Sequence, residues 1–554
     1  MAFGGIMDVD SGKRANGRER IVPWEMFAVL LAVVSFHLLT NVPSEPFFNG
    51  DETRHVMTGA FFADMIRDGV AGGVRGYTTQ YYLQYPALGV LVWPPLFYII
   101  EGLFMLALGT SVTVSKGLEL LALLIACVYL YRLVRSTHGR VCGALACWLF
   151  AFSPLVLTFS RQVMLEIPTV AFCMVALFHY LRFVDGERRA DLIMAAGAAC
   201  GAALTRFDGV FLLAVFVLIA LQSRKARLFR RRDVMVVAGI SAALVSPFYL
   251  LTASEFGSVH AKSIIGGAVS SATVLKALVF YPRSIPDQIG WLVLVFAVIG
   301  LMLGGLGTRT SKLWPYVCLT VGVYVTFTPI ASRESRHAIY WVPGICAMAA
   351  EGVAQLSRRA DRRWVAPALG GIVAVGTVIT AARQPTGFVH GYDRAARYVT
   401  ANIGEQAVCF FDGWLDGDFI YQLRRQDPRR RIRVIRGDKL LYSIISGIRE
   451  EGYWEYSRTD EEILDTLFKY DPALIVVESR AAPELPVAYA LRRVLSSHLE
   501  RFRLETVIPI DTNMPRLRGS SLVVYRNVSR NPSAAKTLEF EMPALGRKLT
   551  GPLR

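Results

Sequence analysis

The sequence predicts a mainly α-helical, polytopic membrane protein that carries an α/β domain at its C-terminal end. Of its 554 residues, 53% are hydrophobic and only 19% are charged, and the mean hydropathy is +0.40. Soluble globular chains are rarely so apolar, and here the apolar residues form long runs that suit membrane helices. After residue 387 the runs become short and β-rich and alternate with helical ones. We therefore expect a cytoplasmic tail at 1–23, a transmembrane domain at 24–387 and an α/β domain at 388–554.

Loop charges predict the topology. The formal net charge is +16, and the basic residues cluster in short loops between apolar runs, which indicates orientation in a membrane rather than nucleic-acid binding. Leu88–Leu108 is apolar but contains Pro94, Pro95 and Glu101. Treating it as a re-entrant or juxtamembrane helix places five basic loops inside the cell; these loops contain Arg132 to Arg140, Arg182 to Arg189, Arg224 to Arg232, Arg309 to Lys312 and Arg358 to Arg363. About eleven spans follow, near 24–42, 113–133, 141–159, 168–184, 192–206, 209–222, 234–251, 289–307, 313–331, 338–356 and 364–383.

This topology places one long loop, at 43–112, and the α/β domain outside the membrane. We therefore expect a multi-pass protein of the bacterial cytoplasmic (inner) membrane, with its C-terminal domain and any active site extracytoplasmic. Polar residues within or beside the apolar runs collect on the outer side, where ionisable groups near a membrane are usually functional. The eight cysteines show neither metal-ligand spacing nor a disulfide framework.

An acidic pair, Asp51 and Glu52, follows the first apolar run. In a strand or extended loop these side chains point in opposite directions, so we expect only one to face a pocket. A carboxylate at a membrane surface can act as a general base on an acceptor hydroxyl. The alternative is a salt bridge with Arg54.

Two further outer loops carry charges. Arg161 suits a phosphate, which its guanidinium can bind bidentately, and Glu166 begins the next span just before Pro168; the alternative is an interface charge pair. Arg206 and Asp208, at the ends of two consecutive spans, fit a structural ion pair as well as a ligand contact.

The loop before the span at 338–356 contains Arg333, Arg336 and His337. Two arginines on the outer side oppose the inward bias of the other loops, so we expect a pyrophosphate or lipid phosphate to bind them. His337 could donate a hydrogen bond to that ligand, although a lone histidine more often has a structural role.

The order of these motifs resembles the GT-C superfamily of integral-membrane glycosyltransferases. A first span is followed by the acidic pair, a tyrosine-rich segment, a Trp-Pro-Pro motif at 93–95, the segment 160–168, the segment 333–343 and an outer α/β domain. The nearest branch is the one with the bacterial lipid A aminoarabinose transferase and the protein O-mannosyltransferases. The resemblance covers most of residues 20–385.

The resemblance implies roles for individual residues. Asp51 matches the first-loop acid that activates the acceptor hydroxyl, Glu52 matches the second acid of that pair, and Glu166 stands where the family usually has aspartate. Trp93 replaces a family histidine and suggests an aromatic wall. The residues expected to bind substrate are Arg54, Tyr82, Trp93, Arg161, Arg333, Arg336 and His337.

These observations together predict an inverting glycosyltransferase that moves a hexose or pentose from a polyprenyl-phosphate donor to a lipid, glycan or protein acceptor. Its partners are these substrates and membrane lipid, with no nucleic acid. No cofactor is evident, although a divalent metal could assist. The alternative is a polytopic transporter or lipid-sugar flippase, which would need charges along a path through the bilayer rather than at one face.

Overall fold

The computed structural model describes residues 23–40, 47–70, 73–265, 271–305, 308, 311–330, 333–360, 364–404, 407–444, 453–481, 484–531, 533–542 and 547–553. The predicted cytoplasmic tail lies, up to residue 22, outside this part of the chain. The chain divides into two compact units. The helical unit comprises Met1–Pro43, Leu91–Phe97 and Lys116–Thr386, and the mixed unit comprises Ser44–Val90, Tyr98–Ser115 and Gly387–Arg554.

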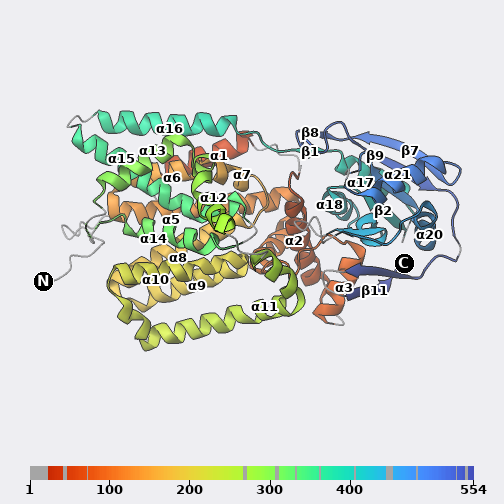
Figure 1. The fold of residues 1–554 in the computed structure, drawn as a ribbon, viewed down its shortest axis with the longest axis horizontal. Coiled ribbons are helices and arrows are strands. Elements are labelled where there is room, and N and C mark those ends of the chain that lie inside the picture. The colour runs from red at the N-terminus through yellow and green to blue at the C-terminus, as the bar shows by residue number, and fades with distance from the viewer. Residues whose placement is uncertain are drawn as a thin grey trace. The chain divides into compact units, whose positions relative to one another are not determined.

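The helical unit is an array of α-helices with short 3₁₀ segments (Figure 1). Every predicted span coincides with one of its helices or helix pairs, because long apolar runs satisfy their backbone groups most readily as helices. Its elements are α1 (Trp24–Thr40), α5 (Val112–His138), α6 (Arg140–Ala151), α7 (Pro154–Ser160), α8 (Glu166–Gly186), α9 (Arg189–Thr205), η1 (Phe207–Phe211), α10 (Leu212–Gln222), η2 (Ala226–Arg230), α11 (Arg232–Ile265), α12 (Ser271–Ile289), α13 (Trp291–Leu303), α14 (Trp314–Phe327), η3 (Ser335–Trp341), α15 (Val342–Arg359) and α16 (Val365–Arg383).

Fewer helices than the predicted eleven are long and apolar enough to cross a membrane completely. In the described part of the chain three do so, namely α5, α8 and residues 232–255 of α11, or up to five if each bent helix pair counts as one span. The pair α6–α7 bends by 63°, and the pair formed by residues 274–289 and α13 bends by 116°. The prediction of about eleven spans therefore stays a prediction, whereas the helical character of each run is confirmed.

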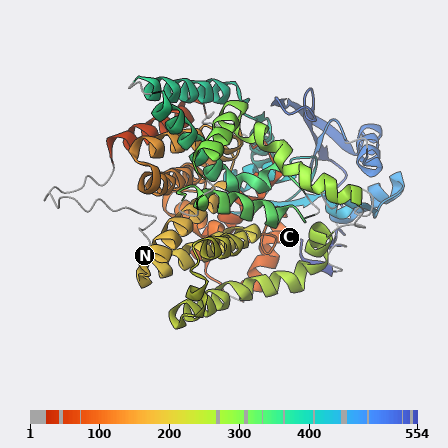
Figure 2. The same cartoon turned by 60° about the vertical axis from the view of Figure 1, so that its left-hand side comes forward.

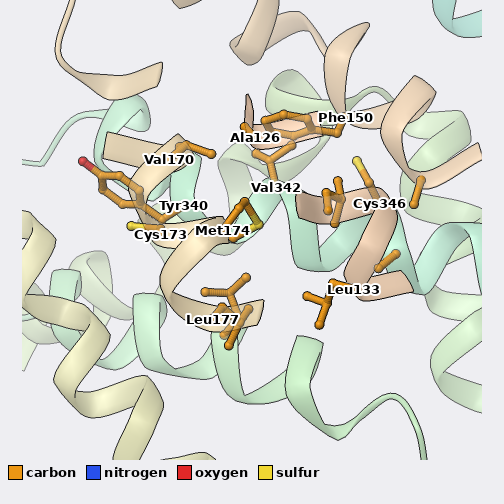
Figure 3. Close-up of a cluster of buried hydrophobic side chains, with 14 of the residues drawn as sticks. Ala126, Leu133, Phe150, Val170, Cys173, Met174, Leu177, Tyr340, Val342 and Cys346 are labelled. Atoms are coloured by element: carbon orange, nitrogen blue, oxygen red, sulfur yellow. The ribbon is translucent and has the colours of Figure 1, made fainter. Parts of the chain in front are cut away.

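Close packing of apolar side chains forms the core of the helical unit. Residues from α5, α6, α8 and α15 interdigitate there, among them Phe150, Met174 and Cys346 (Figure 3). Glycines let α13 and α15 approach closely, since a Cβ atom on Gly300 would collide with the carbonyl oxygen of Met348. The helix α16 runs along one edge of this bundle in both ribbon views (Figures 1 and 2).

The mixed unit is built on a five-stranded sheet in the order β3-β2-β6-β9-β7. Strands β3, β2 and β6 are parallel, whereas β9 is antiparallel to both β6 and β7. Phe410 at the centre of β2 pairs with Ile435 and Ile475 on its two neighbours. Five-residue strands of wholly buried side chains suit a parallel sheet covered on both faces. The sheet strands are β2 (Val408–Asp412), β3 (Arg433–Arg436), β6 (Leu474–Glu478), β7 (Phe502–Pro509) and β9 (Ser521–Asn527).

The alternation of short β-rich and helical runs expected after residue 387 is present in this unit, and its helices include α20 (Asp460–Tyr470) and α21 (Pro486–Ser497). The helices α2 (Gly50–Asp68), α3 (Val74–Gln84), α4 (Leu96–Leu108), α17 (Tyr392–Asn402), α18 (Asp416–Gln426) and α19 (Gly437–Leu440) complete its helical part. The short strands are β1 (Val389–His390), β4 (Tyr442–Ile444), β5 (Tyr453–Glu455), β8 (Asp511–Thr512), β10 (Thr537–Met542) and β11 (Arg547–Pro552).

A buried ion pair joins the long first loop to the C-terminal region within the mixed unit. The Arg424 guanidinium of α18 donates from Nη2 to Oδ1 of Asp64 on α2 at 2.6 Å, and from Nε to the other carboxylate oxygen at 2.9 Å. The Tyr81 hydroxyl donates to the same carboxylate at 2.7 Å. The segment at 43–112 was predicted as part of the transmembrane domain; most of it packs here with the C-terminal residues. The contacts of Asp64 with Arg424 and Tyr81 fix the position of α2, and therefore of its N-terminus, within this unit.

Candidate functional site

The acidic pair lies in the first turn of α2, so the prediction of a strand or extended loop at Asp51 and Glu52 is wrong. Asn49 caps this helix, and its Oδ1 accepts from the backbone N–H of Asp51 at 3.0 Å. Glu52 completes a capping box, because its Oε2 accepts from the backbone N–H groups of Phe48 and Asn49, each at 2.9 Å. Glu52 is 1% exposed, whereas a quarter of the Asp51 side chain is exposed. The two carboxylates therefore have different surroundings, and Asp51 is the accessible one.

Removal of the Glu52 carboxylate is expected to lower the stability of the fold. A Glu52→Ala substitution leaves two backbone N–H groups without their acceptor and should lower the free energy of unfolding by about 1–2 kcal/mol. Thermal unfolding in detergent measures this loss. Glu52→Gln is the matched control, since it keeps an acceptor oxygen, and it should recover most of the stability. Equal losses in the two variants would contradict a capping role.

Arg54 and Tyr82 lie beside a group of charges that the sequence did not predict. The Arg54 guanidinium is 3.8 Å from Asp51 Oδ1, so the alternative salt bridge is present at long range. Burial raises the pKa of Tyr82, and the charges of Arg436, Asp438 and Arg54 act on the same hydroxyl. These side chains come from α2, α3, the last residue of β3 and the helix α19 that follows it directly.

Arg436 organises that group. Its guanidinium donates from Nε to Asp438 Oδ1 at 2.7 Å and pairs with Asp416 at the start of α18. Lys439 has one described carboxylate partner, Asp438 Oδ2 at 3.8 Å, and burial lowers the pKa of this lysine. Thr53 of α2 packs directly on Gly417, where a Cβ atom would meet its hydroxyl. The N-terminus of α2 is thus held against α18, with charged side chains around it.

A second group of charges lies in the helical unit and centres on Glu166, which is fully buried at the start of α8. Arg206 pairs with Glu166, and its Nε also donates to both carboxylate oxygens of Asp208, at 2.7 and 2.8 Å. The Tyr340 hydroxyl donates to Asp208 Oδ2 at 3.2 Å. Arg206 and Asp208 therefore form the ion pair that the sequence left as one of two alternatives.

Arg336 joins this group from the 3₁₀ segment η3. Its Nε is 3.8 Å from Glu166 Oε1 and 2.6 Å from Glu334 Oε2. Gln288 supports the segment by donating to the carbonyl oxygen of Ser335 at 3.1 Å. Arg333 lies at the edge, where its Nε donates to the Thr328 carbonyl oxygen at 3.4 Å. The structure thus brings Glu166 and Arg336 together, while their predicted position on the outer side of a membrane stays a prediction.

His337 follows Arg336 in η3 and stacks on Phe327, with ring centroids 6.2 Å apart. Burial, helped by the charge of Arg206, lowers the pKa of His337 to about 4. The imidazole is therefore neutral at neutral pH. It can act there as a hydrogen-bonding group, but not as a cation for a phosphate.

This lowered pKa predicts a dependence of stability on pH. Between pH 6.5 and about 4 the unfolded chain binds a proton at His337 that the folded chain does not. Stability should therefore fall on acidification through this window, by at most about 1.4 kcal/mol per pH unit from this residue. His337→Gln removes the titrating group, so its unfolding temperature should fall less between pH 7 and pH 4.5. A parallel decline in both proteins would contradict the assignment.

Arg161 lies in a different environment from the other arginines. Its guanidinium donates to the hydroxyls of Thr40 at 2.9 Å and Thr386 at 3.3 Å, and it lies 5.2 Å from the Phe36 ring. No carboxylate of the described chain is within 4.0 Å of it, although the residue is only 7% exposed. Trp93, also in the helical unit, is partly buried in the bend before α4. The described contacts of the Arg161 guanidinium are thus two hydroxyls and an aromatic ring.

Within the residues that the structure describes, no three histidine, cysteine, aspartate or glutamate side chains are grouped so as to hold a metal ion.

Comparison with known proteins supports the fold. The family of dolichyl-phosphate-mannose-protein mannosyltransferases matches residues 92–251. No curated protein sequence matches the chain. The structure of ArnT from Cupriavidus metallidurans with bound undecaprenyl phosphate is similar at a TM-score of 0.60 and 13% identity, over 92% of this chain and 98% of that one.

Two other solved structures are similar over much of this chain. The Archaeoglobus fulgidus oligosaccharyltransferase matches at a TM-score of 0.53 and 12% identity, over 84% of this chain and 72% of that one. A crystal structure of that oligosaccharyltransferase contains zinc and sulfate. The arabinofuranosyltransferase AftD from Mycobacteria matches at 0.52 and 14% identity, over 92% of this chain and 40% of that one. The predicted resemblance is thereby confirmed at the level of the fold.

Proposed function

We propose that this chain, which resembles the GT-C glycosyltransferases in motif order and in fold, transfers a sugar from a polyprenyl phosphate to a hydroxyl group at the outer face of the cytoplasmic membrane. The main support is the similarity to a structure that contains undecaprenyl phosphate, which extends over nearly the whole of both chains. The proposed acceptor is a lipid, glycan or protein. The sugar is a hexose or a pentose.

The proposed reaction is a single displacement that inverts the anomeric carbon. The acceptor oxygen forms a bond to this carbon as the bond between the carbon and the phosphate oxygen breaks. The electron pair of the broken bond stays on the polyprenyl phosphate, and the acceptor proton passes to the Asp51 carboxylate. Asp51 is suited to this role because it is the accessible member of the pair and lies at the positive end of a helix, where a carboxylate is stabilised in its charged form.

The leaving phosphate gains negative charge in this step, so cations should stabilise it. Arg161 is the first candidate, because its described contacts are two hydroxyls and an aromatic ring, which leave its charge unbalanced. Arg333 and Arg336 are further candidates in the same unit. Arg336 already lies between two carboxylates, Glu166 and Glu334, so its charge is partly neutralised.

A substitution at Arg161 tests the phosphate role separately from folding. Arg161→Met removes a buried charge that has no described carboxylate partner, so the folded protein should lose little stability. Donor binding should weaken by about 10- to 100-fold, the usual worth of charge-assisted hydrogen bonds to a phosphate. The KM for polyprenyl-phosphate sugar and the unfolding temperature of the same preparation provide the two readouts. An unchanged KM would contradict the assignment.

The reaction itself is tested with purified protein in liposomes that contain a radiolabelled polyprenyl-phosphate sugar. Transfer to acceptors from an envelope extract, with release of unlabelled polyprenyl phosphate, is the expected result. Parallel reactions with magnesium and with EDTA examine the role of a divalent metal. Movement of the intact labelled lipid between leaflets without cleavage of its sugar–phosphate bond would instead support a flippase.

A further inference from the structure

A cavity of about 160 Å³ lies in the mixed unit between α3 and the segment that enters β3. One wall is a single face of α3, since Tyr77, Gln80, Tyr81 and Gln84 are spaced by three and four residues. The opposite wall contains two arginines, Arg430 and Arg433. Tyrosine rings, amides and guanidinium groups thus converge on one small space, which is the composition of a binding pocket for a polar ligand.

Hydrogen bonds fix the backbone of the arginine wall. The Gln84 side-chain amide donates to the carbonyl oxygens of Arg430 and Ile432. Asp427 Oδ2 accepts from the backbone N–H of Ile432 at 2.8 Å, and so closes the turn from the other side. Arg430 is held in place by an ion pair of 2.6 Å with Asp68. The cavity is therefore preformed, and a ligand would not have to order these groups.

Tyr77 and Tyr81 line the cavity, and their hydroxyls already donate hydrogen bonds to carboxylates. The Tyr77 hydroxyl donates to Asp68 Oδ2 at 2.7 Å, and the Tyr81 hydroxyl donates to Asp64 Oδ2 at the same distance. The two rings lie 6.0 Å apart on one wall. The exposed Gln80 amide lies at the rim, where it can exchange hydrogen bonds with a ligand.

The charge of Arg433 is not balanced locally. Whereas Arg430 pairs with Asp68, the described chain places no carboxylate within 4.0 Å of the Arg433 guanidinium. Its Nη1 is buried without an acceptor in the described structure. Burial lowers the pKa of Arg433, as expected for a partly enclosed cation without an anionic neighbour. An anionic group in the cavity would supply the missing partner.

We propose that this cavity binds a sugar residue that carries one anionic group. Arg433 takes the carboxylate or phosphate through its guanidinium fork, the tyrosine rings pack on the sugar ring, and the Gln80 amide bonds to its hydroxyls. Uronic acids and sugar phosphates share this chemistry. None of these residues belongs to the proposed transfer machinery, so the site is independent of the proposed function.

Calorimetric titration of the full-length protein in detergent tests the proposal with three probes: D-glucuronate, glucose 6-phosphate and glucose. We expect saturable binding of at least one charged sugar, with glucose at least 10-fold weaker. The tighter of the two charged probes indicates whether a carboxylate or a phosphate is preferred. Equal affinity for glucose, or no saturable binding of either charged sugar, would overturn the proposal. Inorganic phosphate that binds as tightly as the charged sugars would also overturn it.

Substitutions at the cavity test whether the charged sugar binds there. Arg433→Met should weaken binding of the charged sugar at least 10-fold, whereas Arg429→Met, an exposed arginine of the same turn that does not line the cavity, should leave it unchanged. Gln80→Trp fills the cavity from its exposed rim and should abolish binding while the fold is retained. This variant therefore tests the site even if Arg433→Met fails to fold. Equal losses in the two arginine variants, or full binding in Gln80→Trp, would place the ligand elsewhere.

Discussion

Replacement of Asp51 by asparagine is expected to lower the rate constant of sugar transfer by about 10²- to 10⁴-fold, the usual contribution of a general base. Asparagine has nearly the same shape but cannot accept the acceptor proton. The fold should survive, because the capping contacts of this helix come from the side chains of Asn49 and Glu52, and asparagine keeps the shape of the Asp51 side chain. Single-turnover assays with labelled polyprenyl-phosphate sugar measure the rate constant.

Two control variants separate the loss of proton transfer from the loss of a negative charge and its ion pair. Asp465→Asn makes the same change at an exposed site on α20 and should leave the rate unaltered. Arg54→Met breaks the same long ion pair, but it should raise KM more than it lowers the rate constant if Arg54 binds substrate. A rate near that of the unmodified protein in Asp51→Asn would refute the base assignment. If Arg54→Met lowers the rate constant by the same factor, loss of the Asp51–Arg54 ion pair, rather than loss of proton transfer, would explain the effect of Asp51→Asn.

Much of the fold could be predicted because its signals are local. Apolar runs become helices, as at α1 and α5, since a long apolar segment buries its backbone groups most easily in that form. Short β-rich runs become strands, as at β2 and β6. The helix α2 also had a local signal, namely the Asn49-x-x-Glu52 pattern of a capping box, but the acidic pair was interpreted as loop chemistry instead. That interpretation produced the wrong geometry for the pair.

The arrangement of the candidate residues could not be predicted in the same way. Asp64 and Arg424 are 360 positions apart, yet their ion pair holds α2 against α18, and no local pattern links them. The charges beside Tyr82 include Arg436 at the end of β3 and Asp438 in α19, a segment that shows no motif of its own. Similarly, Glu166 and Arg206 are 40 positions apart, so a charge that looked available for a ligand is neutralised by a partner from another helix. Such pairings depend on tertiary packing, which residue spacing alone does not reveal.

Replacement of Arg206 by methionine is expected to have the largest effect on stability. The substitution leaves the fully buried Glu166 without its close ion-pair partner, and the largely buried Asp208 without the Nε that donates to both of its oxygens. Breaking a buried pair by removing one partner costs about 3–5 kcal/mol, because the remaining charge is not compensated. Arg336 lies 3.8 Å from Glu166 and offers only partial compensation. The free energy of unfolding, measured by titration with SDS in mixed micelles, should fall by that amount.

The matched control is Arg231→Met. Arg231 also pairs with two carboxylates, Glu187 at 2.6 Å and Asp233 at 2.7 Å, but its side chain is about a third exposed. Solvent can replace those contacts, so the loss should be small. A triple variant that replaces Arg206 by methionine, Glu166 by glutamine and Asp208 by asparagine removes all three charges and should recover part of the stability lost in Arg206→Met. If the single variant is as stable as the unmodified protein, the ion pairs around Glu166 do not support the fold, and Arg206 would then join Arg161 as a candidate ligand for phosphate.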